Sequence, residues 1–328
     1  MPSIMYHCRR NEWTISGGWS KGSQMKTSGF LLFRLNFVDR EDLFPNPIAN
    51  DSDFIQVIEE AATEEFDVVR QGRRTSYGWA LREVVSDSCD QANRPFIFVT
   101  FSYEVMSRKG PIITPGGIAH GTSTLSPPSA TLVRILIDLK RHICAVEDVP
   151  GVIQSHSGWK TSLQTILSSA AWKLLFKSMI HLTPVVPAET VAVRLKSFEK
   201  VTRLRVTLSI PNPDLGPSFQ RLYDEMKRGG VRELSQDMRN ERGLTVAPDT
   251  LPQAALDMAM TGYRKGKIRL YGYKDGRKDN FTVADDVARI EIGEEQDLTE
   301  VHDADQRSSA VKRFAKAIIE RIDESLSR

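Results

Sequence analysis

The stretch RLRVTLSIPNPDLGPSFQRLYDEMKRGG, residues 203–230, carries the clearest structural signals of the chain. Its first eight residues alternate polar and apolar side chains, which predicts a strand with one buried face. The prolines of Pro211-Asn212-Pro213 cannot donate to a β-ladder, so the strand must end there. From Phe219 to Met226 apolar residues recur at helical spacing, and Lys227-Arg228-Gly229-Gly230 supplies the cations and glycines of a helix end. A strand followed by a helix is therefore predicted, without a catalytic motif.

The bulk properties are those of an ordinary globular protein of one large or two average domains, with 328 residues and 26% charged side chains. A net charge of +2 gives no global attraction to nucleic acid or membrane, so such affinity needs a local patch. The three cysteines are scattered without metal-ligand spacing, which fits a reducing cytoplasm. No apolar run approaches the roughly 18 residues of a membrane span, and no signal peptide opens the chain. We expect a cytoplasmic protein without membrane insertion, metal or other cofactor.

Periodicity and punctuation predict the remaining elements. Residues 1–24 are polar and aperiodic, which indicates a disordered leader or a true start at Met25. Asp51-Ser52-Asp53 and Thr250 are typical helix N-caps, whereas glycine, proline, serine and threonine dominate 107–129, as in a long loop. Strands are expected over 30–38, 94–105 and 132–139, and helices after 53 and over 159–180, 231–243 and 250–262.

The fold class that follows is α+β, with mixed, largely antiparallel sheets, packed helices and a C-terminal amphipathic helix. An N-terminal domain is expected over 25–183 and a second one over 184–292. Residues 293–307 continue an acidic run that begins at Glu291 and is typical of a solvated linker. The helix of 308–328 carries an apolar stripe from Val311 to Leu326, which needs either the body or a second subunit as its partner.

A hairpin is predicted over 265–284, because Asp275-Gly276 lies between two strand-like runs. In its first strand, cations and two tyrosines share one face, and cations continue through the turn into the second strand. Such a surface can neutralise phosphates and stack bases. An alternative interpretation is that the cations protect an edge hairpin from aggregation. The predicted nucleic-acid contacts of the hairpin are Lys265, Lys267, Arg269, Tyr271, Tyr273, Lys274, Arg277 and Lys278.

Two pairs of arginines could extend this patch. Arg203 and Arg205 lie on the polar face of the strand that opens the 203–230 stretch, and they join the patch if that strand neighbours the hairpin. Arg73 and Arg74 lie in a basic loop with an aromatic, QGRRTSYG, residues 71–78. All four are candidate phosphate ligands.

Two enzymatic alternatives rest on short motifs. His120-Gly121-Thr122 and His181-Leu182-Thr183 resemble the paired motifs of two-histidine phosphoesterases, in which one histidine is a general base and the other a general acid. With six histidines, however, chance alone yields about one such match, and His120 lies in a glycine-rich loop.

The second alternative is a metal-dependent nuclease. Asp138-Leu139-Lys140 resembles the second half of such a site, in which an upstream carboxylate such as Glu104 would share Mg²⁺. The competing interpretation is an ion pair at a strand end.

The order Leu204–Ile210, Pro211-Asn212-Pro213, Leu222, Gly243-Leu244, Ala254–Gly262 and the basic strand Gly266–Gly272 resembles an uncharacterised bacterial family of phage-defence and mobile-element loci. More distantly, the layout is similar to anti-phage proteins of the RexA and Kiwa B type. The resemblance covers chiefly residues 190–285 and carries over no catalytic residue. It implies a cytoplasmic, oligomeric, DNA-associating protein.

The function predicted is sequence-tolerant DNA binding in anti-phage defence, by a homodimer or larger oligomer that could engage a partner defence protein. The alternatives are a nuclease or phosphodiesterase acting on nucleic acid, and a protein-interaction module that oligomerises through the C-terminal helix.

Overall fold

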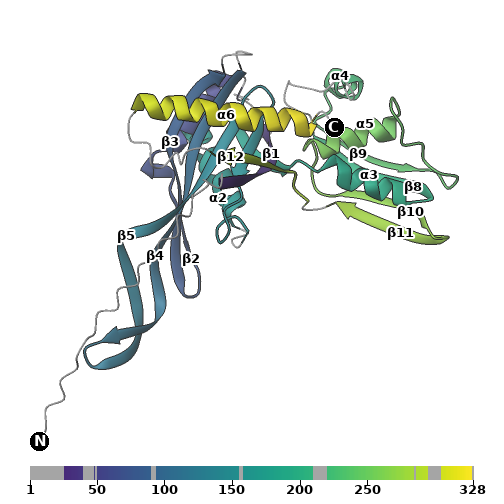
Figure 1. Cartoon of the computed structure of the whole chain (residues 1–328). Coiled ribbons are helices and arrows are strands. Elements are labelled where there is room, and N and C mark those ends of the chain that lie inside the picture. The colour runs from purple at the N-terminus through teal and green to yellow at the C-terminus, as the bar shows by residue number, and fades with distance from the viewer. Residues whose placement is uncertain are drawn as a thin grey trace, which may run out of the picture.

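The computed structural model describes residues 26–39, 48, 50–89, 94–154, 158–209, 220–283, 286–294 and 304–326. The expected leader 1–24, the alternative start Met25, the proline-rich link 211–219 and residues 295–303 of the acidic run lie outside these residues. The chain forms two antiparallel sheets with packed helices, which confirms the α+β prediction (Figure 1).

The strands are β1 (Lys26–Asp39), β2 (Val68–Gln71), β3 (Thr75–Cys89), β4 (Arg94–Thr114), β5 (Gly117–Asp138), β6 (Ile143–Glu147), β7 (Ser178–Pro184), β8 (Lys200–Ser209), β9 (Glu233–Arg239), β10 (Ile268–Lys274), β11 (Arg277–Val283) and β12 (Arg289–Glu294). The helices are α1 (Asp51–Ala61), the short 3-10 helix η1 (Glu64–Phe66), α2 (Trp159–Lys173), α3 (Ala188–Ser197), α4 (Gln220–Arg228), α5 (Leu251–Met260) and α6 (Ala304–Leu326).

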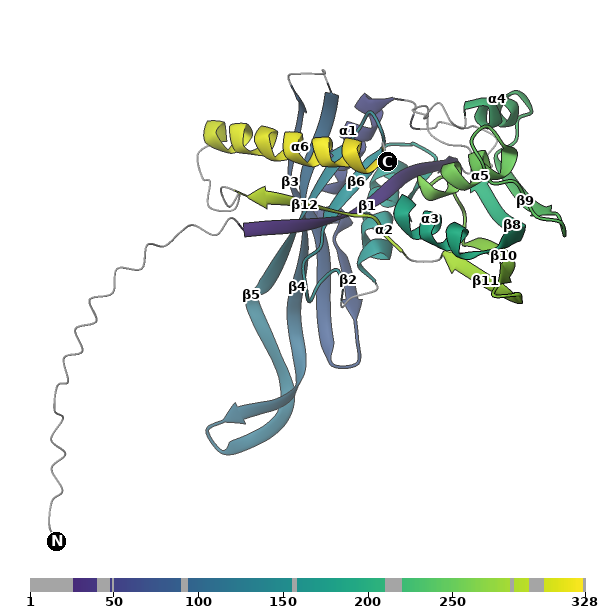
Figure 2. The ribbon, with the colours of Figure 1, turned by 45° about the vertical axis from the view of Figure 1, so that its right-hand side comes forward.

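The larger sheet has the order β12-β1-β6-β5-β4-β3-β2, and β7 pairs with the second half of β1. Helices α1 and α2 pack on one of its faces, in a core built around Phe54, Trp79 and Leu163. Helix α6 packs on the other face, where Phe314 contacts Phe30 and Phe98 (Figure 2). Strands β1, β4, β5 and β6 are consequently buried on both sides, and β4 accordingly carries the continuous apolar run Phe96–Val99.

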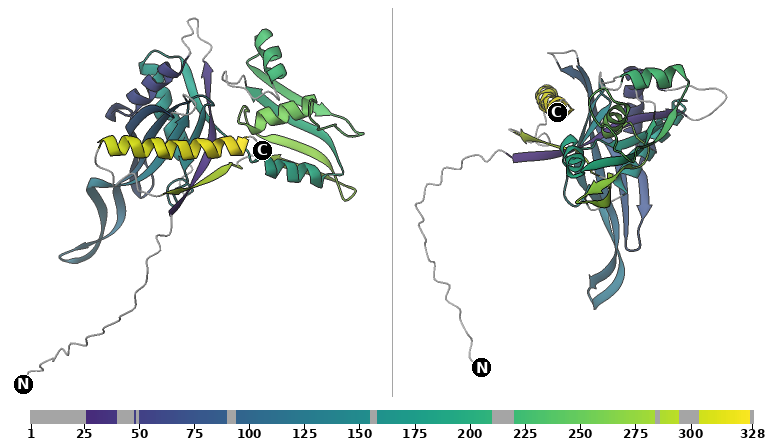
Figure 3. Two further views of the ribbon diagram at one scale, coloured as in Figure 1. Left: turned by 45° about the horizontal axis from the view of Figure 1, so that its top comes forward. Right: turned by 90° about the vertical axis from the view of Figure 1, so that its right-hand side faces the viewer.

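The smaller sheet has the order β11-β10-β8-β9 and lies beside the larger one (Figure 3). Helices α3, α4 and α5 contribute apolar side chains to its core, including Val191, Met226 and Leu256. They meet the apolar face of β8, where Leu204 and Leu208 are fully buried. Because these helices share one core, the opposite face of the sheet is left to polar side chains. The smaller sheet and its helices fall within residues 186–283, whereas β12 and α6 return to the larger sheet.

Arg34 of β1, in the larger sheet, contacts residues 261–263, which follow α5 on the side of the smaller sheet. Its guanidinium lies 4.3 Å from the centre of the Tyr263 ring and donates to the Tyr263 hydroxyl at 2.8 Å and to the Thr261 carbonyl at 2.8 Å. The backbone of Gly262 has φ +95°, and a Cβ there would lie 2.5 Å from that of Arg34. Only glycine fits both restrictions, so residues 261–263 seat the smaller sheet against β1.

Three predictions of elements are wrong: a loop and a helix that are strands, and a helix that ends earlier than expected. Residues 107–129 are not a loop but the outer parts of β4 and β5 and the turn between them. Beyond Arg108, β4 pairs only with β5, and an edge without a further strand accommodates proline. The region 231–243 contains the strand β9 and not a helix, because the alternation in Glu233–Arg239 overrides apolar residues that also fit a helical period.

The helix expected over 159–180 ends at Lys173, where Leu175 takes φ +64° and the Phe176 N–H bonds back to Ala171. The chain then continues as β7.

Smaller corrections concern the ends of elements. The N-cap of α1 is Asn50, one residue before the predicted Asp51-Ser52-Asp53, and it accepts from the Asp53 N–H at 2.9 Å. Thr250 caps α5 as predicted. Residues 291–294 of the acidic run belong to β12, which pairs with β1. Helix α6 begins at Ala304. No helix in the described part of the chain is long and apolar enough to cross a membrane.

Candidate nucleic-acid interface

The candidate interface is the open face of the smaller sheet, opposite helices α3, α4 and α5. Alternation sends Arg203 and Arg205 of β8 to this face, because Leu204 and Val206 enter the core. In β10 the same rule applies to Arg269, Tyr271 and Tyr273, which flank Leu270 and Gly272. We call this surface the open face, and its members also include Asp237 and Arg239 of β9 and Asn280 and Thr282 of β11.

Strand pairing sets the neighbours on this face. Tyr271 pairs with Arg203, and Arg269 pairs with Arg205, so the arginines of the 203–230 stretch do adjoin the hairpin. Arg203 in turn pairs with Arg239. The guanidinium of Arg203 lies 5.1 Å from the centre of the Tyr271 ring, within the range of a cation–π contact. Two tyrosines and four arginines thus occupy one continuous surface.

Asp237 holds the arginines together. Arg203 donates to both carboxylate oxygens of Asp237 at 2.7 Å, and Arg239 approaches the same oxygens at 3.2 and 2.8 Å. Arg205 lies 3.7 Å away. The hydrogen bonds from Arg203 and Arg239 hold the pKa of Asp237 well below its usual value, so the carboxylate stays ionised and the cluster retains a positive net charge.

The second tyrosine has its own cation. The ammonium group of Lys200, at the start of β8, lies 4.8 Å from the centre of the Tyr273 ring and donates to the Glu241 carbonyl at 3.0 Å. Gly272 lies between the tyrosines, and a Cβ there would lie 2.3 Å from the Lys200 carbonyl oxygen. The close approach of β10 to β8 at this irregular register therefore requires glycine.

The hairpin forms as predicted, but its cations divide between two faces. Lys278 pairs with Tyr273 and shares the open face, whereas Lys274 and Arg277 pair with each other one position on, on the side of the helices. Lys265 and Lys267 precede β10, and Lys265 is paired with Glu233 at 2.8 Å. Lys267, Arg269 and Lys278 have no carboxylate partner among the described residues.

Arg73 and Arg74 do not belong to the open face. They form the turn between β2 and β3, in the larger sheet. Conversely, sequence reasoning missed Lys200, Asp237 and Arg239. The polar alternation of Glu233–Arg239 was the available signal, and the predicted helix concealed it.

The two histidine motifs do not meet. His120 lies on the exposed outer part of β5. The 15 residues from His120 to Ile135, where β5 begins to pair with β6 in the body of the larger sheet, span about 50 Å of strand. His181 lies on β7, where its Nδ1 is 3.3 Å from the Gln164 amide nitrogen. Burial, followed by the nearby Lys160 and Lys265, lowers the pKa of His181 and disfavours the protonated form that a general acid needs.

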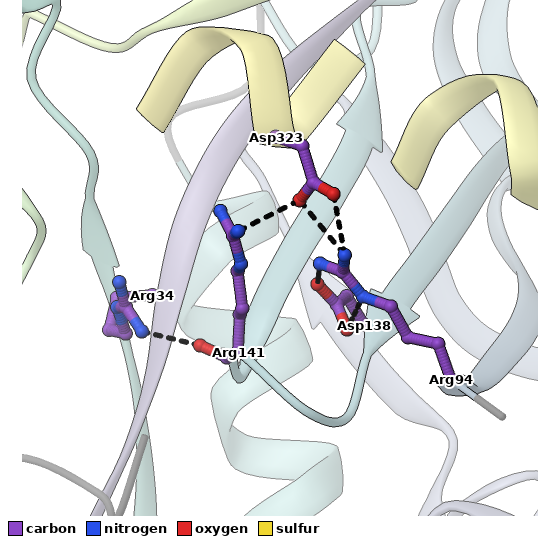
Figure 4. Close-up of polar contacts among 5 residues, drawn as sticks. All are labelled: Arg34, Arg94, Asp138, Arg141 and Asp323. Carbon is purple, nitrogen blue, oxygen red and sulfur yellow. Dashed lines mark hydrogen bonds and ion pairs between the residues drawn. The ribbon is translucent and has the colours of Figure 1, made fainter. Parts of the chain in front are cut away.

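Asp138 forms a buried ion pair with Arg94, which agrees with the competing interpretation of the Asp138-Leu139-Lys140 motif. It is fully buried, and both of its oxygens accept from the guanidinium of Arg94. Arg94 also donates to Asp323 of α6 at 2.9 and 2.8 Å, and Arg141 reaches Asp323 at 3.1 Å (Figure 4). These contacts fasten the end of α6 to the larger sheet.

A shared metal at Asp138 does not fit this geometry. Glu104 lies eight residues along β4 from Phe96, which is the partner of Asp138, and this corresponds to about 27 Å of strand. Lys140 is exposed in the turn after Asp138. Within the described ranges, no three His, Cys, Asp or Glu side chains are placed to hold a metal ion.

Comparison with known proteins gives a family without an assigned activity. No curated protein matches the chain. Residues 127–312 match the family DUF4747, described as a domain of unknown function. The match covers more than half of the chain and includes all four strands of the smaller sheet. The chain therefore belongs to the DUF4747 family.

Proposed function

We propose that this protein binds nucleic acid, without selecting a sequence, through the open face of its smaller sheet. The observation that carries the proposal is the placement of Tyr271 and Tyr273 among Arg203, Arg205 and Arg269 on the surface opposite helices α3, α4 and α5. Single-strand binders combine a positive surface that follows the backbone with aromatic rings on which bases stack. The open face offers both in one place.

The electrostatics support a polyanion as ligand. Four arginines and one aspartate leave three net positive charges in the cluster, before Lys200 and Lys278 are considered. These side chains are spread over β9, β8, β10 and β11, which lie about 4.8 Å apart from strand to strand. Because the cations are distributed, they suit successive phosphates better than one compact anion.

The arrangement also supports sequence tolerance. Stacking accepts every base, because each base has a π-face. Helices α3, α4 and α5 share the core of the opposite face, so the open face presents strands and not a recognition helix to its ligand. Arg203 is held over Tyr271 by Asp237, which pre-orients both groups before a base arrives.

Further parts of the proposal come from the resemblance to phage-defence families. It favours DNA as the nucleic acid, a cytoplasmic location, a homodimer or larger oligomer, and a partner protein in defence. The proposed action is binding and not catalysis, since the candidate histidines and Asp138 do not assemble into a site. The interaction module through the C-terminal helix is less favoured, because Val311 and Ile318 of its stripe are buried against the larger sheet.

Photocrosslinking tests the location of binding. Single-stranded DNA containing 5-iodouracil would be irradiated with the protein, and the crosslinked peptides identified by mass spectrometry. We expect crosslinks at Tyr271 or Tyr273, because iodouracil reacts with an aromatic ring on which it stacks. Crosslinks confined to other surfaces, or none from a folded protein, would contradict the proposal. A Lys196→Ala variant, altered on α3, serves as the matched control and should crosslink normally.

A further inference from the structure

The outer parts of β4 and β5 form an arm that leaves the body of the protein (Figure 2). We define the arm as residues 106–129. At its base Ser107 and Arg108 still pair with β3, and from Lys109 outward β4 pairs only with β5. Its turn is Pro115-Gly116, closed by the pair Thr114 and Gly117. A two-stranded ribbon is marginal by itself in water, so a bound partner would stabilise it.

Cations gather at the base of the arm. Arg108 and Lys109 lie on β4, and Lys109 donates its backbone N–H to the carbonyl of Arg74 at 2.6 Å, which brings in the turn formed by Arg73 and Arg74. None of these four side chains has an ion-pair partner among the described residues. Residues 68–78 and 105–137 contain no aspartate or glutamate. The arm and its base therefore present only positive formal charge.

The tip of the arm is apolar. Ile113 and Ile118 are directly opposite each other in the ribbon, and they are 91% and 81% exposed. These are the largest exposed fractions among the described large apolar side chains. Exposed isoleucines at the end of a cationic ribbon indicate a partner that is a polyanion with apolar surface between its charges.

We propose that this arm lies along the major groove of duplex DNA, with its four basal cations on phosphates and its two isoleucines against thymine methyl groups. The major groove, about 12 Å wide, admits a two-stranded ribbon, and the thymine methyl is the apolar group exposed there. The absence of carboxylates from the arm favours this partner over a protein surface of mixed charge. The proposal extends the function of the open face and does not depend on it.

The dimensions agree with a groove contact. The five residues from Arg108 to Ile113 cover about 17 Å of ribbon. One DNA strand carries a phosphate for each rise of about 3.4 Å, so the arm runs past about five phosphates on each side. Four neutralised phosphates predict that log K changes with log salt at a slope of about −3.6 for duplex DNA.

Three double variants in the full chain test the proposal by duplex binding in a salt series. The arm variant Arg108→Ala/Lys109→Ala should lower the steepness of the duplex slope by about 1.8. The tip variant Ile113→Ser/Ile118→Ser should keep the slope. It should lose the preference for thymine over uracil duplexes, which is about fourfold for each methyl group buried. All four side chains are exposed, so the folded state is preserved, and circular dichroism verifies it.

The third variant, Arg205→Ala/Arg269→Ala on the open face, separates the two sites. If it weakens single-strand binding and leaves duplex binding unchanged, while the arm variant lowers the duplex slope and the tip variant loses the thymine preference, both proposals stand. If the arm variant binds duplex DNA with unchanged affinity and slope, the arm proposal is wrong even when the open face binds. If the arm and tip variants alter only the sedimentation of the protein, the arm is a contact between subunits and the proposal fails.

Discussion

Removing Arg205 and Arg269 from the open face should weaken the salt dependence of single-strand binding. In the variant Arg205→Ala/Arg269→Ala, Arg203 and Arg239 remain paired with Asp237, so the organisation of the face is kept. Arg269 is exposed and Arg205 nearly half exposed. Surface substitutions of this kind change the free energy of unfolding by about 0.5 kcal/mol or less, so a binding defect would not reflect unfolding.

The magnitude follows from the charge count. Three net positive charges in the arginine cluster predict a slope of about −2.1 for single-stranded DNA, and one remaining charge predicts about −0.7. Between 50 and 200 mM salt, the affinity of the unaltered protein should then fall about 18-fold and that of the variant about 3-fold.

Fluorescence anisotropy of a labelled oligonucleotide at four or more salt concentrations measures both slopes. Lys196→Ala/Lys316→Ala is the matched control, because it removes the same charge from exposed positions on α3 and α6. The control should retain the slope of the unaltered protein. An equal slope in the Arg205/Arg269 variant would show that the open face does not contact phosphates and would refute the reasoning.

Three further predictions concern stacking and stability. Tyr271→Ala or Tyr273→Ala should weaken the free energy of single-strand binding by about 1–3 kcal/mol, whereas phenylalanine at either position should weaken it much less. Equal losses for the alanine and phenylalanine variants in a calorimetric titration would exclude stacking. Burial lowers the pKa of His142 to about 4, so the unfolded state takes up a proton at this histidine at a higher pH than the folded state. The contribution to the free energy of unfolding is therefore complete above pH 6.5 and falls by up to about 3 kcal/mol as the pH drops to 4. Denaturant titrations of His142→Asn, which tolerates the φ of +50°, should show a smaller fall; an unchanged pH profile would assign the fall to other groups. Asp138→Ala should lower the free energy of unfolding by about 3–5 kcal/mol, because it leaves Arg94 buried without Asp138, whereas the apolar pair Arg94→Met/Asp138→Leu should recover most of this loss. If thermal melting finds Asp138→Ala as stable as the unaltered protein, the buried pair contributes little.

Local signals predicted much of the smaller sheet. The hairpin follows from Asp275-Gly276, whose φ values of +51° and +71° are those of a two-residue turn that twists with its strands. The alternation from Arg203 to Ser209 placed its arginines on the solvent side, because a strand with one buried face has a period of two. Both features depend on neighbours within a few residues, so the sequence is sufficient for them.

The arm and β9 could not be predicted in the same way. The residues of the arm lack a one-sided apolar period, and those around β9 carry apolar spacings that also fit a helix. In 109–124 both faces are solvated, so burial imposes no alternation, and only the cross-strand hydrogen bonds of β4 and β5 define the structure. In β9 the pairing with β8 decided between strand and helix.

By itself, the sequence determined which residues alternate, where turns occur and which side chains can carry charge or stack, since these depend on local geometry and chemistry. The tertiary structure alone decided which strands became neighbours. Pairing of β8 with both β10 and β9 brought Arg203 to Tyr271 and Asp237, residues 68 and 34 positions away in the chain. It also buried Asp138 against Arg94 and separated His120 from His181. Strand partners are chosen by the packing of the whole core, which no local pattern encodes.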